Sequence, residues 1–383
     1  MDKAKEVLKK NTMLIVLVIV AIFFAWKTNG TLFDPQNITN LIAQNSYVVI
    51  LAVGMLMCIL TGGNIDLSVG SVVCFVGAIA GKLIITAKMN FGLAIIICLG
   101  VGILIGVWQG FWIAFIRIPA FIVTLAGMLL WRGVALIILD GLTLSPFPDT
   151  FKMLFNSYIV NPFGGNINIM CMVVAAAACA VYVLIVLNGR RKKAQKGYTM
   201  EKAVTTAAKT AAVCIVILVV AYRLAQFQGI PTILVLLAVI VGIYAYYTSK
   251  TVGGRYLYAV GGNEKAAKLS GVNTDKVLFF AYTNMAFLSA VAALVCVARF
   301  NSAAPTAGKN YEMDAIASCY IGGASAYGGT GTVAGAVIGA VFMGVLNNGM
   351  SIMGVDSNWQ QAVKGLVLLA AVAFDVISKK RSK

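Results

Sequence analysis

Long apolar stretches alternate with short polar segments along almost the whole chain. We identify twelve such stretches, at 12–26, 41–60, 67–84, 92–116, 121–139, 168–187, 210–224, 231–248, 277–298, 313–326, 332–347 and 361–377. A helix needs about 20 apolar residues to cross a bilayer, and only a helix or a closed barrel satisfies its backbone there. The pattern predicts an all-α polytopic membrane protein, with residues 1–383 forming a single transmembrane domain.

The polar segments carry charge of mostly one sign. Lysine and arginine gather at 3–10, 190–209, 250–276 and 379–383. Under the positive-inside rule these segments mark the cytoplasmic side, which also explains the formal charge of +17 without nucleic acid. Basic segments at these positions attract anionic membrane lipid. Both termini are then cytoplasmic, and the number of crossings is even.

The stretch 313–326 decides that number. It is short and interrupted by glycines, and leaving it out gives eleven crossings and an external C-terminus. Counted as a short or half crossing, it gives about twelve, and a re-entrant pair of half-helices satisfies the same rule. In the next stretch, Gly335 and Gly339 form a GxxxG pattern, which is typical of closely packed membrane helices. Packing within the chain and a dimer contact both remain open.

Composition argues against an enzyme. The chain has no histidine, and its eight cysteines lie in apolar segments without a CxxC pair, so no disulfide framework, zinc site or other metal site is indicated. Phosphate-binding GxxxxGK[ST] and nucleophile GxSxG motifs are also absent. Charged residues inside the apolar stretches are few, and Asp66 is the main acidic candidate for ion coupling.

Residues 61–71, TGGNIDLSVGS, interrupt the apolar pattern with glycines and polar side chains. Broken membrane helices expose polar groups to a cavity or partner, so Asn64, Asp66 and Ser68 are candidates for a gate at the inner mouth. Asp66 and Ser68 also suit the cap of the following helix. Both interpretations stay open here.

Residues 261–276, GGNEKAAKLSGVNTDK, read as a short soluble helix inside an apolar chain. Asn263 suits an N-cap, Glu264 suits the first turn, and Gly271 suits the position after the helix. The pattern predicts a helix of two to three turns with a face of small residues. An amphipathic helix on the membrane surface and a docking element for a soluble partner both fit.

Several motifs resemble one family over nearly the whole length. They are IDLSVGS (65–71), RIPAFIVTLAGMLLWRG (117–133), GRYLYAVGGNEKAAKLSGVN (254–273), SAAPTAGKNYEMDAIASCYIGGAS (302–325), GGTGTVAGAVIGA (328–340) and LNNGMSIMGVDSNWQQAVKG (346–365). The chain is similar to the permease subunits of bacterial ABC importers for monosaccharides, the ribose, galactose and xylose group. The resemblance implies the ABC-importer permease fold in the bacterial cell (inner) membrane.

The resemblance also implies partners. A second permease copy would complete the path, an extracytoplasmic sugar-binding protein would deliver substrate, and a cytoplasmic two-domain ATPase would hold ATP and Mg. This chain itself would hold no cofactor. The loop 249–276 would contain the coupling helix that the ATPase grips, through Gly262, Asn263, Glu264, Ala266, Ala267, Leu269, Ser270 and Gly271.

One difference from the ribose-type members narrows the range of sugars that we expect as substrate. The basic segment 190–209 and its flanking stretches, about 168–224, have no counterpart in the shorter ribose-type members. They resemble the longer xylose and multiple-monosaccharide type, as does TLSPFPD at 143–149. We therefore expect xylose, arabinose, glucose or galactose rather than ribose.

No matched motif defines a sugar site. Sugars need paired polar partners and an aromatic face. The candidates for the translocation path are Gln44, Asn45, Asn64, Asp66, Ser68, Asn284, Asn347, Asn348 and Trp359. Hydrogen bonding between helices is the alternative role for each polar side chain. Two other functions compete with the importer: a stand-alone proton- or sodium-coupled sugar carrier, and a membrane scaffold without transport.

Overall fold

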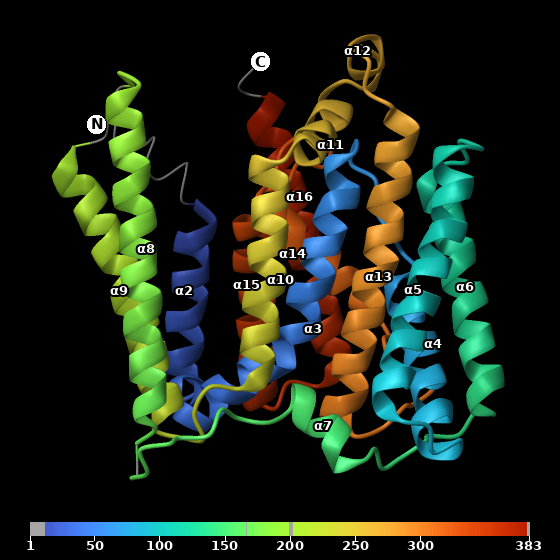
Figure 1. Cartoon of the computed structure of the whole chain (residues 1–383), viewed down its shortest axis with the longest axis horizontal. Helices are drawn as coiled ribbons and strands as arrows, with labels where there is room; N and C mark the ends of the chain where they lie inside the picture. Colours follow the sequence, from blue (N-terminus) through green and yellow to red (C-terminus); the bar gives the residue numbers. More distant parts are fainter. Residues whose placement is uncertain (1–11, 166, 199–201, 381–383) are drawn as a thin grey trace.

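A computed structural model describes residues 12–165, 167–198 and 202–380 (Figure 1). In these ranges ten helices are long and apolar enough to cross a membrane. They are α3 (Pro35–Leu60), α4 (Val69–Gly81, continued to Thr86 by a π turn), α5 (Phe91–Ala114), α6 (Ala120–Leu139), α8 (Ile169–Gln195), α9 (Ala203–Ala225), α10 (Thr232–Lys250), α13 (Thr274–Phe300), α15 (Val333–Ile352) and α16 (Ser357–Lys380). The predicted all-helical membrane class is confirmed.

Two of the twelve predicted stretches form shorter helices. The first is α2 (Thr12–Lys27), and the second is α14 (Tyr311–Ile321), which replaces the predicted stretch 313–326. Three further short helices lie between the long ones: α7 (Asp149–Phe155), α11 (Val252–Gly262) and α12 (Glu264–Leu269). The N-terminal basic cluster 3–10 and most of the C-terminal one lie outside the described residues.

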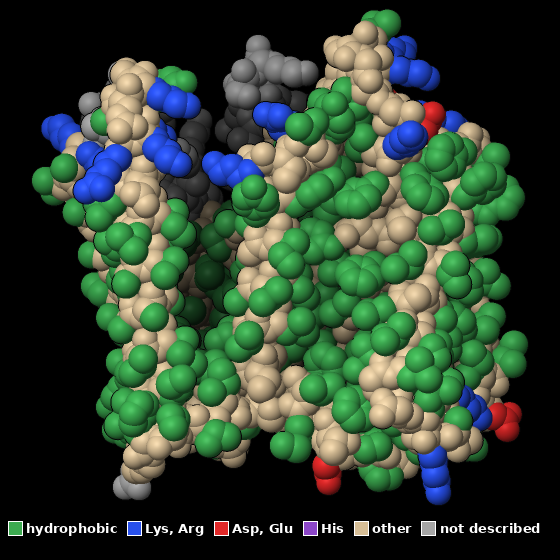
Figure 2. All heavy atoms as spheres, in the orientation of Figure 1, with side chains coloured by type: hydrophobic (Ala, Val, Ile, Leu, Met, Phe, Trp, Pro, Cys, Tyr) green, Lys and Arg blue, Asp and Glu red, His purple; other side chains and the backbone are tan. Residues whose placement is uncertain are grey.

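Helix α3 is the centre of the bundle. Every residue from Val48 to Leu60 is buried, because α13, α14 and α15 pack around it. Helices α5 and α6 lie further out, and large side chains such as Leu129 and Ile137 are exposed on their surface. Figure 2 shows this apolar surface as a wide band with few charges, while most lysine and arginine side chains gather at the end that carries α11 and α12. The distribution fits a bilayer around the bundle.

The GxxxG pattern of α15 packs inside the chain. A Cβ atom on Gly339 would lie 1.9 Å from the carbonyl oxygen of Ser318 on α14. The missing side chain therefore lets α14 and α15 approach closely. Of the two roles left open by the sequence, this contact supports packing within the chain.

Helix α7 closes the bundle at the opposite end from α12. Its residue Phe151 and the preceding Phe147 are fully buried, and α7 packs on α10 and α13. The long segment after α6 is therefore a packed cover rather than a free loop.

Candidate functional site

Helix α12 is positioned by its caps. The side chain of Asn263 accepts a hydrogen bond from Ala266 N at 3.0 Å, and Gly271 has a left-handed φ of +86°. The predicted cap and terminator are thus confirmed, because these residue types satisfy the free backbone groups at the helix ends. The helix spans only Glu264–Leu269, so the predicted length of two to three turns was too long.

The short helix has one buried side and one exposed side. Ala267 is buried against Val260 and Val272, so its side chain holds α12 on the protein and is not part of the exposed docking face. Leu269 lies on the other side and is 90% exposed. The remaining predicted docking positions, Gly262, Asn263, Glu264, Ala266, Ser270 and Gly271, are exposed or half-exposed.

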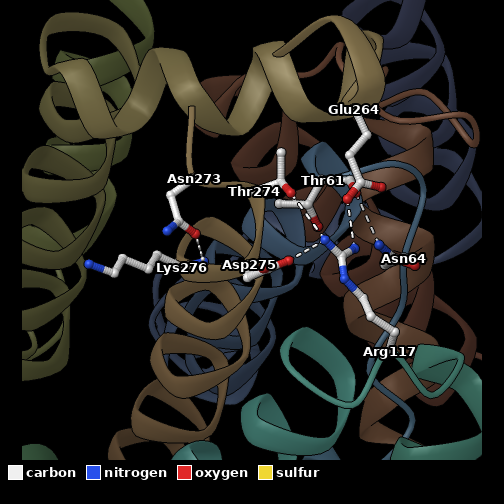
Figure 3. A network of polar contacts seen from close by, with 8 residues as sticks. All are labelled: Thr61, Asn64, Arg117, Glu264, Asn273, Thr274, Asp275 and Lys276. Atoms are coloured by element: carbon white, nitrogen blue, oxygen red, sulfur yellow. Dashed lines mark hydrogen bonds and ion pairs between the residues drawn. The ribbon is translucent and has the colours of Figure 1, made fainter. Parts of the chain in front are cut away.

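Arg117 ties α12 to two other parts of the chain (Figure 3). Its guanidinium pairs with Glu264 of α12 at 2.6 Å and also with Asp275 at the start of α13. It donates a third hydrogen bond to Thr274 Oγ1 at 3.1 Å. Partial burial lowers the pKa of Arg117, but the hydrogen bonds and charges of Glu264 and Asp275 raise it overall. We call this set the Arg117 clamp.

The clamp uses the particular shape of arginine. Its planar group offers several donors in a fixed fork and therefore reaches two carboxylates at once. Arg117 lies between α5 and α6 with a left-handed φ of +64°. The clamp therefore connects the α5–α6 turn, α12 and α13. No local pattern in the sequence indicates the partners of Arg117, which lie far along the chain.

The end of α11 packs directly against the backbone of two other segments, with no side chain between them. A Cβ atom on Gly261 would lie 1.7 Å from the carbonyl oxygen of Leu60 and 2.5 Å from Gly329 N. The Gly329 N–H in turn donates to Leu60 O at 3.1 Å. The end of α3, the end of α11 and the segment before α15 thus meet backbone to backbone. We call these contacts the glycine junction.

The break between α3 and α4 begins at this junction and ends in a buried polar network. Asp66 Oδ1 accepts hydrogen bonds from Ser68 N at 2.8 Å and from Ser68 Oγ at 2.6 Å. Gln109 of α5 donates to Ser68 Oγ at 2.7 Å. All three side chains are buried. Ser68 is the N-cap residue of α4, but its side chain makes no capping hydrogen bond to the helix, so the network fixes the turn before α4, and the role of Asp66 and Ser68 at a gate stays a prediction. The part played by Gln109 was not predicted.

The other path candidates are dispersed. Asn64 lies beside the clamp and donates to Thr61 O at 3.0 Å (Figure 3). Asn45 donates to Ala340 O at 2.7 Å, and Asn348 exchanges two hydrogen bonds with Asn37, at 2.9 and 3.0 Å. Asn284 accepts from the Tyr244 hydroxyl. These contacts link helices to one another and do not gather the side chains into one sugar site.

Three candidates remain without such a link. Gln44 is half-buried on α3, and Trp359 of α16 is 69% exposed. Asn347 of α15 has a buried Oδ1 without a hydrogen-bond partner among the described residues. A buried acceptor of this kind is available to a passing polar ligand.

A buried ion pair joins α14 to α16. Lys364 Nζ lies 3.0 Å from Asp314 Oδ1 and 3.3 Å from Oδ2, which also accepts from Tyr47 at 3.4 Å. The Asp314 side chain is only 3% exposed. The two residues are 50 positions apart in the chain, and no local pattern in the sequence connects them.

Comparison with known proteins identifies the family. Residues 37–372 match the family described as the permease component of the branched-chain amino acid transport system. The chain belongs to this family of transport permeases.

Curated relatives extend the match to nearly the full length of this permease. It is 36% identical to the xylose transport system permease protein of Escherichia coli strain K12, over 97% of this chain and 92% of that protein. It is 37% identical to the xylose transport system permease protein of Haemophilus influenzae, over 100% of both chains. The ribose import permease protein of E. coli is 33% identical, over 96% of this chain and 94% of the relative. No solved structure is significantly similar.

Membership explains the arrangement of the site. A permease component forms a path across the membrane and is not itself a catalyst, which agrees with a multi-pass bundle and a polar attachment point outside it. Within the described residues, histidine, cysteine and acidic side chains form no group that would hold a metal ion.

Proposed function

We propose that this permease is the transmembrane subunit of an ATP-binding-cassette importer of monosaccharides, with xylose as the leading substrate. The observation that carries the proposal is the similarity, over nearly all of the chain, to xylose and ribose permeases, with the higher identities to the xylose proteins. Arabinose, glucose and galactose are the other sugars to test, because the length of the chain resembles that of the broader monosaccharide type.

The proposed topology has twelve crossings. Ten long helices are supplemented by α2 and by the segment that includes α14. The described start of α2 and the end of α16 lie on the same face as α12 (Figure 1), as an even number requires. Lysine and arginine gather on that face (Figure 2), which the positive-inside rule assigns to the cytoplasm.

The proposed coupling element is α12. Leu269 and its exposed neighbours would enter a cleft of the cytoplasmic ATPase. Movement of α12 would then pass through the Arg117 clamp to α5, α6 and α13, and through the glycine junction to α3 and the break before α4. Close backbone contacts favour such transmission of movement. A tightly packed junction has little free space, so a shift of α11 would displace the end of α3.

The proposed complex contains a second copy of this permease, a two-domain ATPase that binds ATP and Mg, and an extracytoplasmic sugar-binding protein. The whole chain acts as one transmembrane domain, with the pair α8–α9 as an addition to its edge. Gln44 and Asn347 are the leading path residues, since neither has an assigned bond to another helix. The permease is expected to hold sugar weakly, because the binding protein selects it.

Reconstitution into proteoliposomes tests the proposal. Uptake of labelled xylose, arabinose, galactose, glucose and ribose is measured with and without the ATPase and the sugar-binding protein encoded beside the permease. We expect uptake only with both partners and ATP, and most of it for xylose. Uptake by the permease alone under a proton or sodium gradient would instead establish the secondary carrier.

A further inference from the structure

The α8–α9 hairpin stands apart from the rest of the bundle. Among the described helices outside the hairpin, α3 alone makes a substantial contact with it. Its attachment lies at the end near α7, where Leu224 of α9 packs with Ile38 and Ile42 of α3. The opposite end of the hairpin, near residue 195, has no comparable attachment among the described residues.

A groove separates this hairpin from α10. Figure 2 shows it as a deep hollow between the two, with apolar side chains along its walls. On α10 the exposed positions form one stripe that includes Val235, Val239, Ile243 and Tyr246. The helices α3, α11 and α15 pack on the rest of α10, so this stripe faces away from the bundle. Almost none of the apolar surface of α9 is buried either.

The rim of the groove is strongly basic. Lysine and arginine side chains gather at the end of the hairpin and opposite it, at the end of α10 (Figure 2). The exposed basic residues of this rim are Arg191, Lys192, Lys193, Lys196, Lys202 and Lys250. Arg190 is excluded from the set, because it donates to Thr206 and joins α8 to α9. Among the described residues of 168–226 there is no acidic side chain.

Together these observations define one ligand. An apolar groove the length of a helix accepts acyl chains, and a basic rim at the membrane surface accepts an anionic headgroup. We propose that the groove between α8–α9 and α10 binds an anionic phospholipid, with its phosphate held by the basic rim. The lipid would occupy the hollow that Figure 2 shows between the hairpin and α10. The assignment to the cytoplasmic leaflet rests on the proposed topology.

This site is more specific than the general attraction of basic loops to a membrane. Topology alone requires positive charge on one side, but it does not require a hairpin attached at only one end. The phospholipid would support the unattached end of α8–α9 against the bundle. Removing the rim charges should therefore change which lipid occupies the groove without changing how the chain is inserted.

Photo-crosslinking in nanodiscs tests the proposal with the full-length permease. The discs contain equal amounts of phosphatidylglycerol and phosphatidylcholine. A photoreactive phenylalanine analogue replaces Ile243 in the groove or, as a control, Leu129 on α6, which is 67% exposed away from the hairpin. Mass spectrometry then identifies the adduct. We expect at least threefold enrichment of phosphatidylglycerol at 243 and the bulk ratio at 129, where roughly 0.65 kcal/mol corresponds to threefold.

Charge variants complete the test. The double substitution K192Q/K196Q should abolish the enrichment at 243, whereas K27Q/K88Q removes the same charge from the opposite membrane face and should preserve it. The bulk lipid ratio at 243 in the unmodified permease would overturn the proposal. An adduct with α8 or α9 of the same chain, or with a second copy, would also overturn it, because protein would then occupy the groove. Since the readout is lipid identity, these outcomes are independent of sugar uptake.

Discussion

Arg117 and Glu264 are 147 residues apart in the chain, and their side chains form an ion pair at 2.6 Å. The pair joins the turn between α5 and α6 to α12 (Figure 3). Both side chains are about two-fifths exposed, at 40% and 43%. An ion pair exposed to this extent contributes little to the stability of the fold.

Replacing Arg117 should reduce sugar uptake strongly while changing the stability of the fold very little. We expect R117A to change the free energy of unfolding by no more than about 1 kcal/mol, since exposed ion pairs contribute little. Sugar uptake should fall at least tenfold, because α12 would lose its link to α5 and α6. R117K should fail almost as badly, since a lysine cannot hold two carboxylates in a fork. Thermal unfolding and proteoliposome uptake measure the two effects.

The control for Arg117 is its neighbour Lys276. This exposed lysine lies beside the clamp, where Asn273 accepts from its backbone N–H and leaves the side chain outside the clamp. K276Q removes one positive charge and should retain uptake. Equal losses in R117K and K276Q would show that only local charge matters and that the clamp has no coupling role.

Gly261 offers a steric test of the glycine junction. G261A would place a methyl group 1.7 Å from Leu60 O, so the end of α11 must move away from α3. We expect lower thermal stability and loss of uptake. The adjacent G262A is a matched control for the loss of thermal stability, because a Cβ atom there meets nothing within 4 Å. Normal uptake in G261A would mean that the glycine junction can shift without impairing transport, and it would contradict the proposed role of the junction.

Leu269 tests the docking face. L269E places a charge at a position that is 90% exposed, so folding and membrane insertion should be unaffected. If the ATPase covers this side chain, burial of the unpaired charge should weaken co-purification of the ATPase by at least tenfold. L142E is the control, since Leu142 is 64% exposed near the opposite face. Unchanged binding in L269E would remove α12 from the interface.

Lys364 tests the buried ion pair. K364M leaves the Asp314 carboxylate buried without its cation, and breaking such a pair costs about 3–5 kcal/mol. We expect a lower melting temperature for K364M and substantial recovery in D314N/K364M, which removes both charges. Tyr47 still has an acceptor in the double variant. If the double variant is no more stable than K364M, the pairing of charges is not what stabilises α16.

Asp66 distinguishes the importer from the proton- or sodium-coupled carrier. In D66N the amide oxygen still accepts from Ser68 N and Oγ, so the break before α4 keeps its two hydrogen bonds. A permease driven by ATP needs no titrating group here, and uptake should stay within about twofold of the unmodified protein. Loss of uptake with an intact fold would instead favour a carrier that uses this carboxylate.

Local features of the chain determined its class and several of its parts. Apolar stretches of membrane-spanning length fixed the all-helical bundle, because a bilayer leaves the backbone no other partner. The caps of α12 followed from Asn263 and Gly271, since capping depends on a few adjacent residues. The basic segments indicated which ends share a face. The length of α12 was less predictable, because helix ends depend on what they pack against.

Tertiary structure alone decided which distant residues meet. Arg117 with Glu264, Asp314 with Lys364, and Gly261 with Leu60 are all contacts between segments far apart in the chain. Their geometry depends on how the helices are arranged in space. The residue type at a single position does not predict that arrangement. The same reason explains the predicted path residues. Asn45 and Asn348 bond one helix to another in the folded bundle, a role that the sequence offered only as an alternative to lining the path.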